Sequence, residues 1–282
     1  MIRNMRKQNS AKPEPGRLLM IVLISGITMI AVFPFYSMII MGTHYANDLF
    51  TGIKLLPGAY LLENFKTLLT IDIVGYYKNS LLVAVSSMIL CVLVCSMAGF
   101  AFAKYEFRGK NILFTFILLT MMIPMQLGLV AFVIEMKTLG WLNTLLPLII
   151  PPAANAFGAF WMTQFAKSAI PNEVIESARI DGCGEFRLFF QIALPFMKPA
   201  CTTLGLLAFL WSWNSLLTPL ILITQESLYT LPLGIRQLNT NFRFDFAAQI
   251  LGLTLGTIPI LIIFAVFSKS LIRGLSAAAV KG

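Results

Sequence analysis

Two cysteines and one histidine have the side chains best suited to metal binding or proton transfer in this sequence. Cys91 and Cys95 are four residues apart, a spacing that puts both thiols on one face of a helix and that metal sites also use. His44 is the only histidine, and neither a histidine nor a carboxylate stands near the cysteine pair. We therefore predict no metal site, interpret the cysteines as small packing residues, and assign His44 no role in moving protons.

Acidic residues and a glycine mark a second region, residues 167–198. Pro171 suits the first position of a helix, and Glu173 and Glu176 favour the positive N-terminal end of a helix dipole. These signals predict a short helix from about 172 to 181.

One face of this short helix carries small and apolar side chains. Ile175, Ala178 and Gly182 recur at helical spacing, and Gly182 is expected to end the helix in a turn. Small residues on this face would let the surface of another protein approach closely, which favours a docking site. Periodicity alone leaves open an amphipathic helix that lies on the membrane surface.

Apolar stretches make up most of the remaining chain. Hydrophobic residues form 58% and charged residues 12% of the 282 residues, about half the charged share of a soluble domain. Six windows without Lys, Arg, Asp or Glu are 18–47, 79–103, 111–134, 138–166, 199–225 and 246–268. About 20 apolar helical residues cross the hydrocarbon layer, so each window predicts one spanning helix. The predicted fold class is an all-α integral membrane protein with six transmembrane helices.

The distribution of Lys and Arg predicts the orientation of these helices. With a cytoplasmic N-terminus, the inside segments carry 15 of the 21 bases and the outside loops carry 6. Cytoplasmic loops are the ones enriched in Lys and Arg, so both termini are predicted to be cytoplasmic, as is the loop 167–198 between the fourth and fifth spans. A net charge of +9 on so apolar a chain indicates lipid headgroups as partners rather than nucleic acid.

Groups that would drive transport from within the chain are missing. The six windows hold no formal charge, whereas ion-coupled transporters and intramembrane enzymes generally place ionisable groups at that depth. The sequence also lacks the Gly-x-x-x-x-Gly-Lys-Ser/Thr phosphate loop. We therefore predict a non-catalytic chain that binds no cofactor and depends on a partner for any active transport.

The loop 167–198 also carries a long spaced pattern. It resembles the Glu-Ala-Ala-x3-Gly-x9-Ile-x-Leu-Pro signature of ABC importer membrane subunits, in which Ser177 replaces an alanine. The matching positions are Glu176, Ser177, Ala178, Gly182, Ile192, Leu194 and Pro195. Other stretches are similar to permeases of the carbohydrate-uptake, maltose-type family, in particular to the smaller permease subunit: Asn79-Ser80-Leu81, Phe107-Arg108-Gly109-Lys110, Met121-Met122-Ile123-Pro124, Trp213-Asn214 and Arg273-Gly274-Leu275-Ser276.

This resemblance implies a larger assembly in a bacterial or archaeal plasma membrane. In such importers two permease subunits, here expected to form a heterodimer, line the path for the sugar. Two ATPase subunits use ATP and Mg beneath them, and an extracytoplasmic sugar-binding protein delivers the substrate. The helix around 173–182 would be the coupling helix that an ATPase groove receives. The expected coupling residues are Glu173, Glu176, Ser177, Ala178, Asp181, Gly182, Ile192, Leu194 and Pro195.

The predicted domain organisation has three parts. Residues 1–17 form a cytoplasmic N-terminal segment, residues 18–272 the six-span permease domain, and residues 273–282 a cytoplasmic tail. By resemblance, the tail ending in Lys281 and Gly282 reaches the ATPase. The outer loop 226–245 resembles the segment that meets the binding protein.

Prolines and a few polar residues at membrane depth indicate the path itself. The spans are interrupted by Pro124, Pro147, Pro151, Pro152, Pro219 and Pro259, and such breaks are tolerated where a cavity or a neighbouring helix takes up the freed carbonyls. Because sugars combine polar edges with faces that stack on aromatic rings, the expected substrate contacts are Gln126, Asn155, Trp213 and Asn214. Hydrogen bonds between helices are the alternative role for these residues.

The function that follows from sequence and resemblance is import of a sugar or oligosaccharide. An importer of a polyol or glycerol phosphate is the alternative within the same class, since the coupling signature does not identify the substrate. A stand-alone facilitator would need no coupling loop. A membrane-embedded enzyme would need a buried nucleophile, a metal set or an acid–base pair, which the sequence does not contain.

Overall fold

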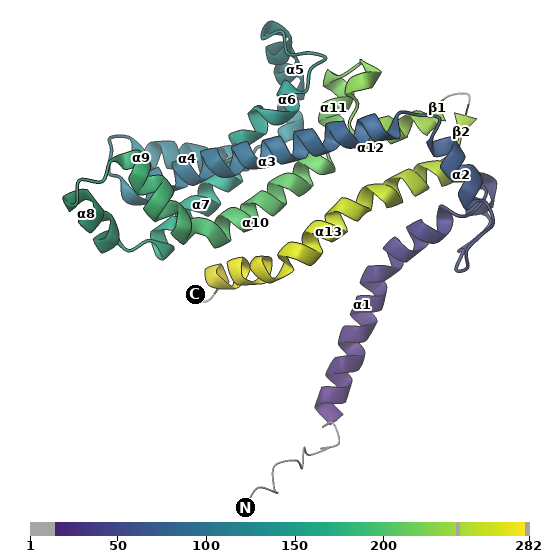
Figure 1. Cartoon of the computed structure of the whole chain (residues 1–282), viewed down its shortest axis with the longest axis horizontal. Helices are drawn as coiled ribbons and strands as arrows, with labels where there is room; N and C mark the ends of the chain where they lie inside the picture. Colours follow the sequence, from purple (N-terminus) through teal and green to yellow (C-terminus); the bar gives the residue numbers. More distant parts are fainter. Residues whose placement is uncertain (1–14, 241–242, 280–282) are drawn as a thin grey trace, which may run out of the picture.

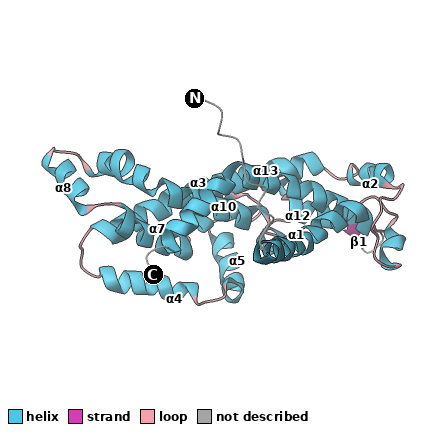
Figure 2. Ribbon diagram, turned by 90° about the horizontal axis from the view of Figure 1, so that it is seen from below, coloured by secondary structure: helices cyan, strands magenta, loops and turns pink. Residues whose placement is uncertain are grey.

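The computed structural model describes residues 15–240 and 243–279, most of which are helical (Figure 1). The strands β1 (Asn239–Thr240) and β2 (Arg243–Phe244) form one short antiparallel pair. The molecule is elongated, with α8 (Asn172–Ile180) at one end and α2 (Leu61–Leu68) at the other in both Figure 1 and Figure 2. These are called the α8 end and the α2 end below. The prediction of a helical membrane protein is confirmed.

Four helices in the described part of the chain are long and apolar enough to cross a membrane. They are α1 (Pro15–Met41), α3 (Ile73–Lys104), α13 (Phe246–Ala279), and one continuous helix made of α9 (Glu185–Arg187), the π-helical turn η4 (Leu188–Ala193) and α10 (Leu194–Trp213). The continuous helix starts earlier than the window 199–225, within the predicted cytoplasmic loop. Charged residues mark where a helix leaves the membrane rather than where the helix itself begins.

The third predicted span is bent. Helix α4 (Lys110–Met121) and the segment Gln126–Thr138, which contains α5 (Leu129–Thr138), meet at 92°. The break lies around Pro124, just before the 3-10 turn η2 (Met125–Gly128). Proline has no N–H to continue the helix and disfavours helical backbone for the residue before it. The bend that Pro124 predicted is therefore present.

The fourth predicted span is divided as well. Its window contains α6 (Leu146–Ile149), the 3-10 turn η3 (Pro151–Ala153) and most of α7 (Ala156–Ala169). Helix α7 has 14 residues, which is too short to cross the hydrocarbon layer alone. The described residues thus hold four candidate spans, or up to five if the bent pair is one span. The predicted count of six is not confirmed.

Helix α3 is the centre of the packing and lies against both α7 and α10. Two glycines allow α3 and α7 to approach closely. A Cβ on Gly99 would lie 2.5 Å from the Cβ of Met162, and a Cβ on Gly158 would lie 2.7 Å from the Sγ of Cys95. Small residues at such crossings are what lets membrane helices pack tightly. Cys91 and Cys95 are buried in this core, with their Sγ atoms 3.9 Å apart.

Five further short elements complete the described chain, and three of them are hydrogen-bonded to the first turns of α3. Their bounds are η1 (Ala46–Phe50), α11 (Leu217–Leu222), η5 (Glu226–Leu228), α12 (Leu231–Ile235) and η6 (Arg236–Leu238). The Tyr76 hydroxyl lies 2.8 Å from carboxylate and amide oxygens of Glu226 and Gln237, and Ser80 Oγ accepts the Leu231 N–H at 2.7 Å. The loop after residue 225 is thus a packed segment of the molecule.

Helix α1 stands apart from this body. Figure 1 shows that only its C-terminal part lies beside α13, while its N-terminal part projects away. No residue in its membrane-length window is buried inside the chain. Most of the length of α1 is therefore available to lipid or to another subunit.

Candidate functional site

The α8 end contains the predicted short helix and the turn that ends it. Gly182 follows α8 with a φ of +74°, and nothing lies within 4 Å of where its Cβ would be. Its N–H donates to the Arg179 carbonyl at 3.0 Å, and the Cys183 N–H donates to the Ala178 carbonyl at 2.9 Å. This pair of bonds is the Schellman arrangement, which favours glycine at the left-handed position. Gly182 therefore ends the helix as expected.

The small apolar stripe of α8 faces its own chain. Ile175 is 3% exposed and Ala178 is 7% exposed, and both belong to the core cluster that contains Leu188 and Phe189. Our interpretation of Ile175 and Ala178 as a surface open to another protein is therefore wrong. Periodicity identifies the apolar stripe of a helix but not the body against which that stripe packs.

The opposite face of α8 is exposed and combines acidic with apolar side chains. Ile180 is 86% exposed, and Phe186, just beyond the turn, is 75% exposed. Glu176 and Asp181 are exposed, and their carboxylates form no hydrogen bond or ion pair with another described residue. Large apolar side chains left exposed among charges are typical of protein interaction sites. Sequence reasoning missed Ile180 and Phe186, because their exposure can be inferred only when it is known which face of α8 packs against the rest of the chain.

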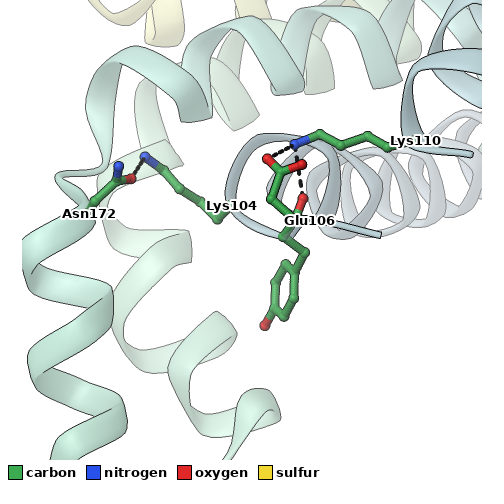
Figure 3. A network of polar contacts seen from close by, with 5 residues as sticks. Lys104, Glu106, Lys110 and Asn172 are labelled. Carbon is green, nitrogen blue, oxygen red and sulfur yellow. Dashed lines mark hydrogen bonds and ion pairs between the residues drawn. The ribbon is translucent and has the colours of Figure 1, made fainter. Parts of the chain in front are cut away.

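Polar contacts tie α8 to the end of α3. The Lys104 ammonium donates to Asn172 Oδ1 at 2.7 Å, beside the Lys110–Glu106 ion pair at 2.7 Å (Figure 3). At the other end of α8, the Arg179 guanidinium lies 5.0 Å from the ring centroid of Tyr105. One end of the short helix is thus bonded to the last residue of α3, and the other end contacts the first residue after it.

Arg179, Tyr105 and Glu185 form a compact group that we call the Arg179 cluster. Arg179 Nε lies 3.3 Å from Glu185 Oε1, and the Tyr105 hydroxyl donates to the other carboxylate oxygen. Burial raises the pKa of the Tyr105 hydroxyl, and its hydrogen bond to the Glu185 carboxylate raises that pKa further. Through one carboxylate, the cluster joins α8, α9 and the residue that follows α3.

The second half of the signature lies on the helix that follows α8. Ile192 and Leu194 are partly buried against the core cluster, and Pro195 is exposed in the first turn of α10. The π-helical turn η4 ends at Ala193, two residues before Pro195, whose missing N–H interrupts the regular ladder. Ile192 and Leu194 thus pack against the same core cluster that contains Ile175 and Ala178 of α8.

The remaining predicted ATPase-contacting residues lie on α8 or in the C-terminal tail. Glu173 and Ser177 are exposed on α8. Lys281 and Gly282 lie outside the described residues. Helix α13 continues through the predicted tail boundary at 273 as far as Ala279.

A cavity of about 420 Å³ lies between α3, α10 and the broken segment around α6. No charged residue lines it. Cys91 and Trp211 contribute to its wall, and its polar side chains are Ser87, Asn155, Ser212, Ser215, Thr218 and Thr230. The cavity therefore offers neutral hydrogen-bonding groups and an aromatic ring, but no acid, base or metal set.

Of the four predicted substrate contacts, Asn155 alone lines the cavity, where its Oδ1 also accepts the Gly158 N–H at 2.7 Å. Gln126 is exposed on η2. Trp213 is buried and donates its indole N–H to the Gly256 carbonyl at 3.0 Å.

Asn214 instead caps its own helix by donating to the Leu210 carbonyl at 2.8 Å. The residues that sequence reasoning missed are Trp211 and Ser212, in the last turn of α10, and Ser215, just after its end. The sequence signal that could have identified them is the recurrence of polar residues within the charge-free window 199–225.

Comparison with known proteins covers most of the chain. Residues 92–278 match the family described as binding-protein-dependent transport system inner membrane component. The arabinooligosaccharides transport system permease protein AraQ of Halalkalibacterium halodurans is 33% identical over 91% of this chain and 93% of its own. The lactose transport system permease protein LacG of Rhizobium radiobacter is 28% identical over 90% and 92%. The sn-glycerol-3-phosphate transport system permease protein UgpE of Salmonella typhi is 32% identical over 90% and 93%.

A solved structure has the same fold. It is a bacterial ABC transporter involved in the import of the acidic polysaccharide alginate, matched with a TM-score of 0.77 and 22% identity over 93% of this chain and 98% of that one. Together with the apolar helices, the family match identifies a multi-pass protein of the inner membrane and confirms the resemblance to permeases of the carbohydrate-uptake type. The chain belongs to the family of inner membrane components of binding-protein-dependent transport systems.

Proposed function

We propose that this chain is the membrane-spanning permease subunit of an ABC importer for a sugar or oligosaccharide, with ATP and Mg used by partner ATPase subunits. The observation that carries the proposal is α8, which presents an exposed face at one end of the molecule and is fixed to the central helix. The relatives named for arabinooligosaccharides and lactose support a sugar as the substrate.

In this proposal the exposed face of α8 is the coupling surface. Ile180 and Phe186 enter an apolar groove on the ATPase, and Glu176 and Asp181 meet donors at its rim. A contact that has the same binding free energy in both conformations of the ATPase cannot by itself shift the conformation of the permease. A rigid linkage must therefore transmit the movement of the ATPase to the membrane helices. The Arg179 cluster and the Lys104–Asn172 bond are that linkage, since α3 continues from them to the cavity.

We propose a six-span topology with both termini and α8 on the cytoplasmic side. The bent α4–α5 pair is the third span, and α6, η3 and α7 together are the fourth. Irregular backbone at membrane depth is tolerated where it lines a cavity, and η3 contributes to the cavity wall. The course of α13, which runs from the α2 end toward the α8 end in Figure 1, is consistent with this orientation.

Thiol labelling in cells tests the topology. In a background without native cysteines, a Cys at Ser227 should react with an impermeant reagent from outside, and a Cys at Ser276 should not. The reverse pattern would overturn the orientation.

We propose that a second permease subunit covers α1 in a heterodimer, because no residue in the membrane-length window of that helix is buried within the described chain. The segment 226–245 at the α2 end meets the sugar-binding protein. The tail with Lys281 and Gly282 contacts the ATPase. Removing residues 276–282 should leave membrane insertion intact and lower both transport and stimulated ATP hydrolysis, whereas unchanged transport would exclude a role for the tail.

A polyol or glycerol phosphate is the second candidate substrate class, favoured by the relative named for sn-glycerol-3-phosphate transport. The experiment that separates the two uses the chain assembled with its companion permease and ATPase in proteoliposomes. ATP-driven uptake of lactose, arabinotriose, maltotriose and sn-glycerol 3-phosphate is measured with and without the binding protein. Uptake of a sugar that requires both ATP and the binding protein supports the proposal. Sugar uptake that requires neither would indicate a stand-alone facilitator.

A further inference from the structure

We infer that the cavity between α3, α10 and α6 is a subsite within this chain for one uncharged sugar ring, with Trp211 as the stacking surface. The inference rests on the proposed function and deepens it, because it assigns part of the substrate path to this subunit instead of to its companion. Four features of the cavity carry it: depth, unpaired polar groups, the aromatic ring and the absence of charge.

The cavity extends from the α2 side of the molecule to the middle of α3. Ser87 lines it from α3, roughly 21 Å from the Ile73 end and roughly 26 Å from the Lys104 end at about 1.5 Å per helical residue. Polar groups at this depth have no bulk water as a partner. They either pair with the protein or meet a ligand or water in a cavity.

Several polar groups of the wall are unpaired. Thr230 is buried, and its Oγ1 has no hydrogen-bond partner among the described residues. Ser212, Ser215 and Thr218 are partly exposed, and their hydroxyls make no hydrogen bond within the described chain. Leaving a buried hydroxyl without a partner costs free energy, so such groups are normally satisfied. A polyhydroxyl ligand would satisfy them from the cavity side.

Trp211 supplies the apolar surface that the face of a sugar ring needs. Its side chain is 46% exposed, and its ring meets Phe157 nearly at right angles, with 5.8 Å between centroids. Phe157 thus braces the indole on one side. The cavity volume of about 420 Å³ lies within the roughly 300–1,000 Å³ typical of small-molecule sites.

The lining also discriminates by charge. A phosphate ester or a carboxylated sugar is normally held by Arg, Lys or free N–H groups at the start of a helix. No Arg or Lys lines this cavity. Helix α7 begins beside it, but Asn155 Oδ1 already accepts the Gly158 N–H in the first turn. The wall therefore matches a neutral ring.

Alkylation of Cys91 tests the subsite, because this residue lines the cavity while Cys95, one turn away on the same helix, does not. Two forms of the full assembly are prepared, each with one of these cysteines as the only thiol. A small uncharged maleimide is applied with and without lactose, arabinotriose, maltotriose or sn-glycerol 3-phosphate. At saturation, a bound sugar should slow the alkylation of Cys91 by about threefold or more and leave Cys95 unchanged.

Variants of the wall complete the test. Trp211→Leu should abolish protection of Cys91 and lower sugar uptake by about tenfold, whereas Trp211→Phe should keep most of both. Ser212→Ala should weaken protection by about threefold. Ser168→Ala, on α7 away from the cavity lining, is the control and should change neither.

The outcomes separate this inference from the proposed function, because labelling does not depend on transport. Sugar uptake by the wild type without protection of Cys91, or with protection that Trp211→Leu retains, would overturn the subsite and leave the importer in place. Protection by sn-glycerol 3-phosphate alone would overturn the assignment to an uncharged ring. Protection by a sugar without any uptake would support the subsite and overturn the proposed function.

Discussion

The α8 end and the cavity are built in opposite ways. Helix α8 and its turn come from one continuous stretch of about a dozen residues, whose ends are fixed by Pro171 and Gly182. The cavity wall comes from α3, the proline-rich segment 147–156, α10 and Thr230, which are far apart along the chain. The α8 end, as a local site, should keep its structure when one polar contact is removed. The cavity depends on close packing of separate elements, so an added atom at one of their contacts should destabilise it.

The largest expected effect is therefore in the packing beside the cavity. Gly158→Ala puts a Cβ 2.7 Å from Cys95 Sγ at the contact between α3 and α7, and should lower the free energy of unfolding by about 2 kcal/mol. Thermal unfolding of the purified assembly measures the loss. Gly128→Ala is the control, because nothing lies within 4 Å of its Cβ position.

A second substitution makes this test specific for the contact. Cys95→Ala removes the sulfur that the new Cβ would meet, so it should restore part of the stability in the Gly158→Ala background. No recovery would mean that the close approach of α3 and α7 at this point does not limit stability.

A smaller effect is expected at the start of α7. Asn155→Ala removes the acceptor of the Gly158 N–H and should cost about 1 kcal/mol of stability. Asn155→Asp retains an acceptor and should recover most of that loss. Equal destabilisation by both substitutions would show that the cap does not hold this edge of the cavity.

The Arg179 cluster should affect coupling more than stability. Arg179→Met removes a cation–π contact and a partly exposed ion pair, together worth about 1 kcal/mol, so α8 should remain folded and keep the ATPase bound. The stimulation of ATP hydrolysis by sugar and binding protein should fall, because the tie to α3 is lost. Arg187→Met, which removes only the bond to Gln191, is the control. Normal stimulation in Arg179→Met would exclude the cluster from the linkage.

The smallest effect is a dependence on pH near the ordinary pKa of tyrosine, about 10. Since the folded protein raises the pKa of Tyr105, the resulting stabilisation is present below the unfolded pKa and is lost as the pH rises through the folded pKa. The difference in melting temperature between wild type and Tyr105→Phe should therefore shrink above pH 10. A difference that stays constant from pH 8 to pH 11 would contradict this assignment.

Sequence reasoning predicted the features that local rules determine. The short helix, its glycine turn and the bend at Pro124 all depend on residues within a few positions of each other. The direction in which Ile175 faces depends on Leu188 and Phe189 of the following helix, and no local pattern contains that information.

The cavity was largely missed for the same reason. Asn155 was identified as a polar residue at membrane depth, but Trp211 and Trp213 could not be distinguished by type. One of these tryptophans lines the cavity and the other is buried and bonded to Gly256. The division of the window 138–166 into three short elements also depends on packing around the cavity, because prolines allow a break without setting its shape.

The central claim is that the exposed face of α8 holds the ATPase. The most direct test is retention of the wild-type ATPase subunit during purification of Ile180→Asp and Gly182→Asp. Ile53→Asp, whose apolar side chain is similarly exposed near the α2 end, is the matched control. Burying a carboxylate at a docking contact should weaken binding by at least about tenfold.

We expect both α8 variants to insert normally in the membrane, lose the ATPase and show no sugar-stimulated hydrolysis, while Ile53→Asp retains the ATPase. Full retention of the ATPase and wild-type stimulation in both α8 variants would contradict the assignment of α8 as the coupling helix.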